Sequence, residues 1–169
     1  MTDVVDVETR SRMMANIRSE NTSPEILIRK ALHARGFRFR VHVKKLPGTP
    51  DLVLPKYKAV IFIHGCFWHG HNCRYFRIPK TRQEFWMVKI GKNQERDERQ
   101  LNALRALKWR TLVLWECAVR TMKKQESHLL VDKIIYWLLH ESECTQINEA
   151  HLMSECSCNT PKIRRNVFR

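Results

Sequence analysis

The sequence contains no run of apolar residues long enough to cross a membrane. Stretches such as residues 59–63 fall far short of the roughly 20 apolar residues that a spanning helix needs. The opening segment, Met1-Thr-Asp-Val-Val-Asp, carries neither a basic cluster nor an apolar segment, so we expect no secretory signal. Internal repeats and low-complexity runs are also missing. These features predict a cytoplasmic protein without a membrane partner.

Acidic residues are scarce relative to basic ones. The 169 residues include 31 Lys and Arg but only 17 Asp and Glu, which gives a formal net charge of +14. Such an excess on one domain-sized chain attracts polyanions, and nucleic acid is the first candidate because phosphate contacts dominate its binding. The alternative is a basic surface that binds nothing. Hydrophobic residues make up 43% of the chain, which is enough for a packed core without covalent cross-links.

The pattern of apolar residues predicts an α/β fold. One helix should begin with Ser23 as N-cap and Pro24 in its first turn, and end at Gly36. Strands are expected at residues 37–43, 51–54, 57–64 and 109–116. The strand at 57–64 is apolar on both faces and should be central. Further helices are expected at residues 81–107, with Gly91 as a point where the helix could break, and at 127–140. This order predicts three layers around a small mixed sheet.

The six cysteines occur in a chain without an export signal, which indicates a reducing compartment where Cys beside His is typical of metal ligation. The candidate ligands are Cys66, His71, Cys73 and Cys117. If the strand at 109–116 runs parallel beside the strand at 57–64, both end at one sheet edge and the four side chains can meet. Thiolate and imidazole ligands favour zinc, and four protein ligands make a closed, structural site. The alternative is free cysteines and surface histidines; Cys144, Cys156 and Cys158 are expected to be unliganded.

Several residues suggest phosphodiester hydrolysis, which needs a metal ion to neutralise charge and a base to activate water. Asp51 opens a strand directly after a turn, where its carboxylate could hold Mg²⁺ or merely cap the turn. Glu25 and Asp97 lie on apolar helical stripes, where a carboxylate needs a metal ion, a hydrogen-bond donor or a paired Arg. His64 and His69 remain as general acid–base candidates, and these residues alone leave open which one acts.

Large aromatic side chains lie in the cysteine loop and in the basic stretch that begins at Lys80. Phe67 and Trp68 in the loop, and Trp86 among cations, suggest wedges or stacking surfaces for DNA bases. For Phe85, packing in the core is the better interpretation.

Five stretches of the sequence together resemble the very short patch repair endonucleases, bacterial enzymes that nick DNA at a T·G mismatch. They are Thr9-Arg-Ser-Arg-Met-Met, Leu46-Pro-Gly-Thr-Pro-Asp-Leu-Val, Val60-Ile-Phe-Ile-His-Gly-Cys-Phe-Trp-His-Gly-His-Asn-Cys, Phe85-Trp-Met-Val-Lys-Ile-Gly-Lys-Asn-Gln-Glu-Arg-Asp and Leu114-Trp-Glu-Cys-Ala. The resemblance covers residues 1–140 and implies one domain with a restriction-endonuclease-like core and an N-terminal DNA-contacting arm. Residues 141–169 form a polar, basic tail without a counterpart.

The resemblance also implies roles for individual residues. Asp51 would bind catalytic Mg²⁺ directly, together with the backbone carbonyl of Ile63. His69 would be the general base. Three further groups would not bind the metal ion directly but would act through water or orient His69: Glu25, His64 and Asp97. The structural zinc ligands would be Cys66, His71, Cys73 and Cys117, and the residues that insert beside the mismatch would be Phe67, Trp68, Trp86 and, from the opposite groove, Met14.

One departure from the family concerns position 63, where its members carry Thr and this chain carries Ile63, which keeps the carbonyl but lacks the hydroxyl. The resemblance implies a nick 5′ to the T of a T·G mismatch left by deamination of 5-methylcytosine. It further implies a monomer at the bacterial nucleoid, with mismatch-repair proteins and a repair polymerase as partners. Two rivals stay open: a zinc-stabilised DNA-binding module without catalysis, and a restriction-type endonuclease of other specificity.

Overall fold

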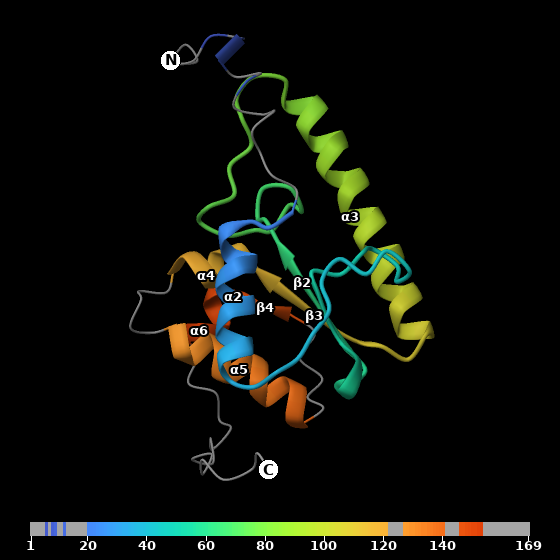
Figure 1. The fold of residues 1–169 in the computed structure, drawn as a ribbon. Coiled ribbons are helices and arrows are strands. Elements are labelled where there is room, and N and C mark those ends of the chain that lie inside the picture. Colours follow the sequence, from blue (N-terminus) through green and yellow to red (C-terminus); the bar gives the residue numbers. More distant parts are fainter. Residues whose placement is uncertain are drawn as a thin grey trace.

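A small mixed β-sheet lies at the centre of the computed structural model, which describes residues 6, 8, 9, 12, 20–121, 127–140 and 146–153 (Figure 1). Its strands, in spatial order, are β1 (Leu52–Leu54), β2 (Ala59–His64), β3 (Arg110–Trp115) and β4 (Gln146–Ile147). β1 is antiparallel to β2, whereas β2, β3 and β4 run parallel. Because His64 pairs with Trp115, β2 and β3 end at the same edge of the sheet. The parallel pairing of β2 and β3, which the predicted meeting of four metal ligands required, is therefore confirmed.

Helices cover both faces of this sheet, so the predicted α/β class is confirmed. They are α2 (Ser23–Ala34), α3 (Gln83–Ala106), α4 (Glu116–Thr121), α5 (Ser127–His140) and α6 (Glu149–Met153), and a short 3-10 helix, η1 (Pro55–Tyr57), joins β1 to β2. Figure 1 shows the long α3 on one side of the sheet and the other helices on the opposite side. α3 makes the crossover that two parallel neighbours such as β2 and β3 require.

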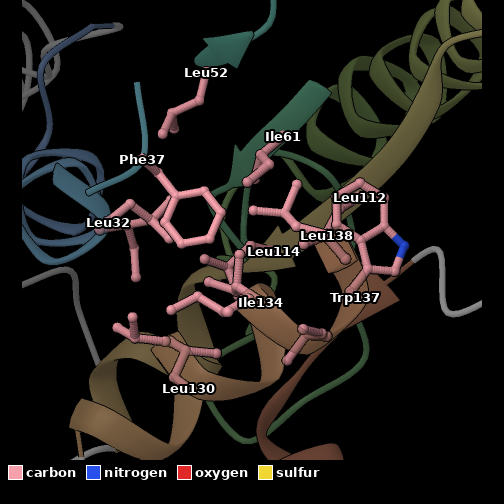
Figure 2. Packing of buried hydrophobic residues seen from close by; sticks show 14 of the residues in the cluster. Leu32, Phe37, Leu52, Ile61, Leu112, Leu114, Leu130, Ile134, Trp137 and Leu138 are labelled. Carbon is pink, nitrogen blue, oxygen red and sulfur yellow. The ribbon is translucent and has the colours of Figure 1, made fainter. Parts of the chain in front are cut away.

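Alternate side chains of β2 enter two separate hydrophobic clusters. Ile61 packs in the larger one, which α2 and α5 close (Figure 2). Phe62 packs in the smaller one, against Leu104 of α3. The apolar stripe of α5, at the four-residue spacing seen in the sequence, is fully buried: Leu130, Ile134 and Leu138 are 0%, 0% and 2% exposed. Burying one such side chain stabilises the fold by about 1.5–3 kcal/mol, which fixes α5 against the sheet.

Three local predictions were wrong. Residues 37–43 form no strand: the segment makes one bridge, from Arg40 to Val53, and His42 leaves extended conformation at φ 48°. The N-cap of α2 is Thr22, not Ser23, because Thr22 is still extended and donates its backbone N–H to Glu25. α3 continues through Gly91 without a break.

The remaining boundaries agree closely with the pattern. α5 spans the predicted residues, and β2 begins two residues late because Lys58 adopts φ 48° after η1. β4 and α6 follow residue 141, in a part of the chain that has no periodic pattern. In the described residues, no helix is both long and apolar enough to cross a bilayer. Met14, Cys144, Cys156 and Cys158 lie outside the described residues.

Candidate active site and metal site

The loop at residues 65–73, between β2 and α3, carries most of the predicted site, and one face of α3 holds it. Asn93 donates to the carbonyl of Trp68 at 2.8 Å, and Gln94 donates to the carbonyl of His69 at 3.2 Å. Gly70 has φ +63°, and a Cβ there would approach Gln94 Nε2 to 2.5 Å. Any other residue at position 70 would be strained at this φ and would also press on Ile90 of the helix, 2.7 Å from the added Cβ, so glycine favours the close approach of loop and helix.

A histidine–aspartate pair occupies the cavity side of the loop. The ring of His69 hydrogen-bonds through Nδ1 to Asp97 Oδ2 on α3. His64, at the end of β2, stacks on His69 with ring centroids 3.8 Å apart and planes 6° apart. With Nδ1–H donated to the carboxylate, the lone pair of His69 is on Nε2, where a general base can accept a proton. All three groups line a cavity of about 470 Å³.

The pKa values of His64 and Asp97 are both lowered, but for different reasons. Burial lowers the pKa of His64 to about 3, and the neighbouring His69 contributes to the same shift. His64 therefore stays neutral at physiological pH. Burial alone would raise the pKa of Asp97, but the hydrogen bond from His69 and the nearby positive charges outweigh it, so its pKa is lowered. Asp97 is thus an ionised partner that keeps the His69 ring in place.

Asp51 lies one strand away, directly before β1. Its Oδ2 accepts the backbone N–H of Ile63 at 2.6 Å. In a strand, the N–H and C=O of one residue point to the same side, so the carbonyl of Ile63 faces the Asp51 side of β2. Burial raises the pKa of Asp51 to about 6 against the effect of that hydrogen bond; Glu25 adds to the rise, whereas Arg29 opposes it. Among the described residues, no ion pair involves this half-buried carboxyl, which suits a cation site.

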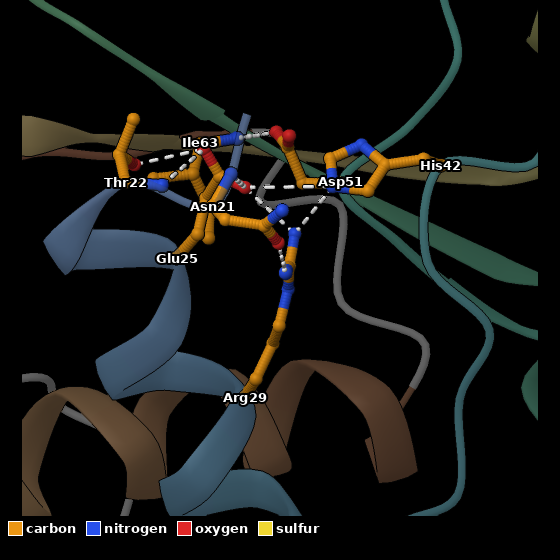
Figure 3. A network of polar contacts seen from close by, with 7 residues as sticks. All are labelled: Asn21, Thr22, Glu25, Arg29, His42, Asp51 and Ile63. Atoms are coloured by element: carbon orange, nitrogen blue, oxygen red, sulfur yellow. Dashed lines mark hydrogen bonds and ion pairs between the residues drawn. The ribbon is translucent and has the colours of Figure 1, made fainter. Parts of the chain in front are cut away.

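Glu25 is buried and surrounded by protein donors (Figure 3). The backbone N–H of Asn21 and the guanidinium of Arg29 donate to its Oε2 at 3.0 and 2.6 Å. Thr22 donates its N–H and hydroxyl to Oε1 at 3.3 and 2.8 Å. His42 Nε2 lies 3.8 Å from Oε2. The sequence left open whether Glu25 pairs with an arginine, and in the structure it does, with Arg29.

Two buried thiols and two half-buried groups form a second cluster at the common edge of β2 and β3. Their ligand atoms all lie within 4.8 Å of one another, and the residues are Cys66, His71, Cys73 and Cys117. Cys117, in α4, has its Sγ 3.6 Å from His71 Nδ1 and donates its N–H to Cys66 Sγ at 3.3 Å. Burial raises the pKa of both the Cys66 and Cys117 thiols and lowers that of His71. Neutral imidazole and clustered thiols that a cation would deprotonate match a Cys₃His metal site.

The loop aromatics gather with the first turns of α3. Phe67, Trp68 and Trp86 have ring centroids 5.1–6.1 Å apart, at steep mutual angles. Lys89 extends over the Trp68 and Trp86 rings at 5.4 and 5.7 Å. Phe85 was predicted to pack in the core; instead it is 47% exposed beside this cluster, because it faces solvent from the first turn of α3.

The structure thus brings the predicted residues that it describes into four groups: one at Asp51, one at His69, one at Cys66 and the aromatic cluster that includes Trp86. Sequence reasoning missed the residues that anchor these groups, among them Arg29, Asn93 and Trp115. The Trp115 ring stacks on His71 at 4.2 Å and contacts His64 edge-on at 5.5 Å, so it joins the cysteine cluster to the histidines. The position of Arg29, four residues after Glu25 on a helix, was the one signal available.

Comparison with known proteins identifies the class of this site. The family described as DNA mismatch endonuclease Vsr matches residues 2–75. DNA mismatch endonuclease Vsr of Escherichia coli (strain K12) is 45% identical over 148 residues, 88% of this chain and 95% of that protein. Type II nicking enzyme V.XorIIP of Xanthomonas oryzae is 47% identical over 129 residues, 76% of this chain and 95% of the relative. Type II nicking enzyme V.NmeAIP of Neisseria meningitidis is 47% identical over 120 residues, 71% and 86% of the two chains.

The protein is accordingly a DNA endonuclease. The chain belongs to the Vsr family of DNA mismatch endonucleases, as the first resemblance suggested.

Proposed function

We propose that this protein is a Mg²⁺-dependent endonuclease that nicks one DNA strand 5′ to the T of a T·G mismatch and so begins very short patch repair. The observation that carries the chemistry is the His69–Asp97 pair beside a neutral His64, on a loop one strand away from Asp51. The name of the E. coli relative and the nicking enzymes among the others support the mismatch and the single-strand cut. A central mixed sheet with helices on both faces is compatible with a restriction-endonuclease-like core.

Asp51 and the carbonyl of Ile63 would hold the catalytic Mg²⁺. Both are oxygen ligands on one side of β2, which is the donor type that this ion prefers, and the carboxylate lies where burial penalises its charge. A bound Mg²⁺ would neutralise charge on the phosphate and make a bound water more acidic. The absent hydroxyl at position 63 does not affect this set, because the ligand atom belongs to the backbone.

His69 would take the proton of the attacking water at Nε2. Asp97 fixes the tautomer from the opposite side of the ring, and His64 limits rotation by stacking on it. A positioned general base of this kind contributes about 10²–10⁴-fold to the rate. Glu25 keeps a role at the site, but through Asp51 and its surroundings, since protein donors already occupy its oxygens.

Zinc would occupy the cysteine cluster as a structural ion. In a tetrahedron with Zn–S near 2.3 Å and Zn–N near 2.1 Å, a sulfur and a nitrogen ligand lie about 3.6 Å apart. The Cys117 Sγ to His71 Nδ1 distance is 3.6 Å. The ion would fix the loop that carries His69, with the protein supplying all four ligands.

The aromatic cluster would contact DNA beside the mismatch. The half-buried aromatic cluster lies beside the Lys89 cation, and its members are Phe67, Trp68 and Trp86; apolar side chains among cations are used by proteins that wedge between base pairs. Met14 would insert from the opposite groove. The wider predictions, namely the monomeric state, the repair-protein partners, the nucleoid location and the role of residues 141–169, remain predictions.

The test of the catalytic assignment is a His69→Ala variant. We expect nicking of a T·G duplex to fall by at least about 10²-fold, while affinity for that duplex, measured by fluorescence anisotropy, changes little. The reason is that His69 lines the cavity, whereas the aromatic cluster does not. Near-normal turnover would remove His69 as the base. Mismatch binding without cleavage by the unmodified protein, at any Mg²⁺ concentration, would favour the non-catalytic DNA-binding module instead.

A further inference from the structure

Arg29 lies at the meeting point of three segments around Asp51 (Figure 3). It projects from α2, and its Nη1 donates to Asn21 Oδ1 at 2.6 Å, in the turn before that helix. Its Nη2 donates to Glu25 Oε2 at 2.6 Å and contacts His42 Nε2 at 2.9 Å. Its side chain is only 13% exposed. The guanidinium therefore joins the turn, the helix and the segment that leads to the active-site aspartate.

Both loop residues that it contacts have unusual backbone conformations. Asn21 and His42 have φ angles of 57° and 48°, in the left-handed region that L-residues rarely adopt. Such conformations persist where the surroundings impose them. Because a guanidinium can only donate, His42 accepts from Arg29 with Nε2. A charged, planar donor that bonds both residues is well suited to hold these turns.

Glu25 has no acceptor position left for another partner. An ionised carboxylate offers about four lone-pair positions. Oε2 receives Asn21 N–H and Arg29, and Oε1 receives two donors from Thr22. With the side chain only 3% exposed, a metal-bound water could reach Glu25 only by displacing one of these donors. The Arg29 bond is the one that a cation at Asp51 would compete with directly, because it alone carries positive charge.

We propose that Arg29 is a positioning residue of the metal site: it keeps Glu25 in the cap of α2 as half of a neutral ion pair, so that Asp51 alone supplies negative charge to the cation. The inference rests on the proposed function in so far as Asp51 is the Mg²⁺ ligand. It predicts that Arg29, which touches neither metal nor substrate, sets the affinity of the site for divalent ions.

The experiment measures Mn²⁺ binding to the zinc-loaded full chain without DNA, from the electron paramagnetic resonance signal of the free ion. Mn²⁺ is the weakest divalent competitor for a thiolate site, so the zinc stays in place. The variants are Arg29→Met, Glu25→Gln and the double variant. Gln is also a good residue at the third position of a capped helix, so Glu25→Gln should keep the cap.

Removing Arg29 alone should tighten Mn²⁺ binding about tenfold, because an unpaired Glu25 charge is left beside the site. Removing the Glu25 charge alone should weaken it by a similar factor, because the Arg29 cation is then unpaired. The double variant should bind within about threefold of the unmodified protein, since a neutral pair has been replaced by neutral side chains. If Arg29→Met folds poorly, Arg29→Gln has the same charge change and the same expected result.

Arg35→Met is the matched control. It breaks the Arg35–Asp132 pair at the other end of α2, where both side chains are exposed, and should leave Mn²⁺ affinity unchanged. A double variant that binds as weakly as Glu25→Gln would show that Glu25 serves the cation directly and would overturn the proposal. Asp51→Ala distinguishes a failure of the proposed metal site from a failure of the role given to Arg29. If Mn²⁺ still binds to Asp51→Ala, the metal assignment and this inference are both overturned. If Asp51→Ala loses Mn²⁺ binding and the double variant also binds Mn²⁺ weakly, this inference alone is overturned.

Discussion

Asp51 has a cost in stability that its proposed role as a metal ligand would explain. Its carboxylate is half-buried at the start of β1, and burial raises its pKa to about 6. The folded protein without metal therefore holds a proton that the unfolded chain releases near its ordinary pKa. Stability that comes from this proton is complete below that ordinary pKa and is lost as pH rises towards 6. Above that pH the ionised side chain destabilises the metal-free fold until a cation neutralises it.

Asp51→Asn should consequently stabilise the metal-free protein at pH 8. Each pKa unit corresponds to about 1.4 kcal/mol, so the gain is on the order of 2 kcal/mol after some allowance for solvent. The amide oxygen of the substituted side chain would still accept the Ile63 N–H, so the hydrogen bond is kept. Urea denaturation at pH 8 and pH 4 measures the effect, and most of the gain should vanish at pH 4, where Asp51 is already neutral in the folded protein. A destabilised variant at pH 8 would contradict the raised pKa.

At the scale of elements, α3 is the frame on which the site is assembled. Successive turns of this helix present Trp86 and Lys89 to the aromatic cluster, Asn93 and Gln94 to the loop backbone, and Asp97 to His69. The crossover from β2 to β3 fixes both ends of this frame. Aromatic contacts, loop anchors and the Asp97 partner of His69 thus follow one another along a single helix.

We expect zinc to hold the loop at residues 65–73 against α4, because the predicted ligands come from both segments. Cys117→Ser removes one thiolate, so we expect zinc content, measured by atomic absorption, to fall well below one ion per chain, and the free energy of unfolding to drop by several kcal/mol. Cys144→Ser, at a cysteine predicted to be unliganded, is the control and should keep full zinc. Unchanged zinc in Cys117→Ser would mean that another residue completes the site.

Sequence reasoning succeeded where side-chain periodicity was long and failed where single residues decided. α5 and the doubly buried β2 were predictable because their apolar patterns span several turns or pleats. Residues 37–43 alternate like a strand, yet one left-handed residue, His42, prevents pairing beyond Arg40. β4 has two residues, too few for any periodic signal. The side chains that form these groups could be named from the sequence, whereas their anchors depend on distances that no spacing encodes. The roles of these side chains as metal ligands and catalytic groups stay predictions.

At the scale of the whole molecule, the excess of positive charge and the proposed roles of these groups all favour DNA as the substrate. A net charge of +14 attracts the DNA backbone without regard to sequence. The aromatic cluster, the His69–Asp97 pair and Asp51 all adjoin the loop at residues 65–73 or the strand that precedes it. With the proposed roles, recognition and cutting would share one piece of structure, which a single structural ion would hold in shape.

The most direct test of the proposed activity is cleavage of an end-labelled duplex over a Mg²⁺ titration. The duplex carries one T·G mismatch, with the T at a position where 5-methylcytosine would deaminate. We predict a single nick 5′ to the mismatched T that depends on Mg²⁺, with the complementary strand intact and the matched T·A duplex uncut under the same conditions. Equal cutting of fully paired DNA on both strands, or cleavage that persists when Mg²⁺ is chelated, would contradict it.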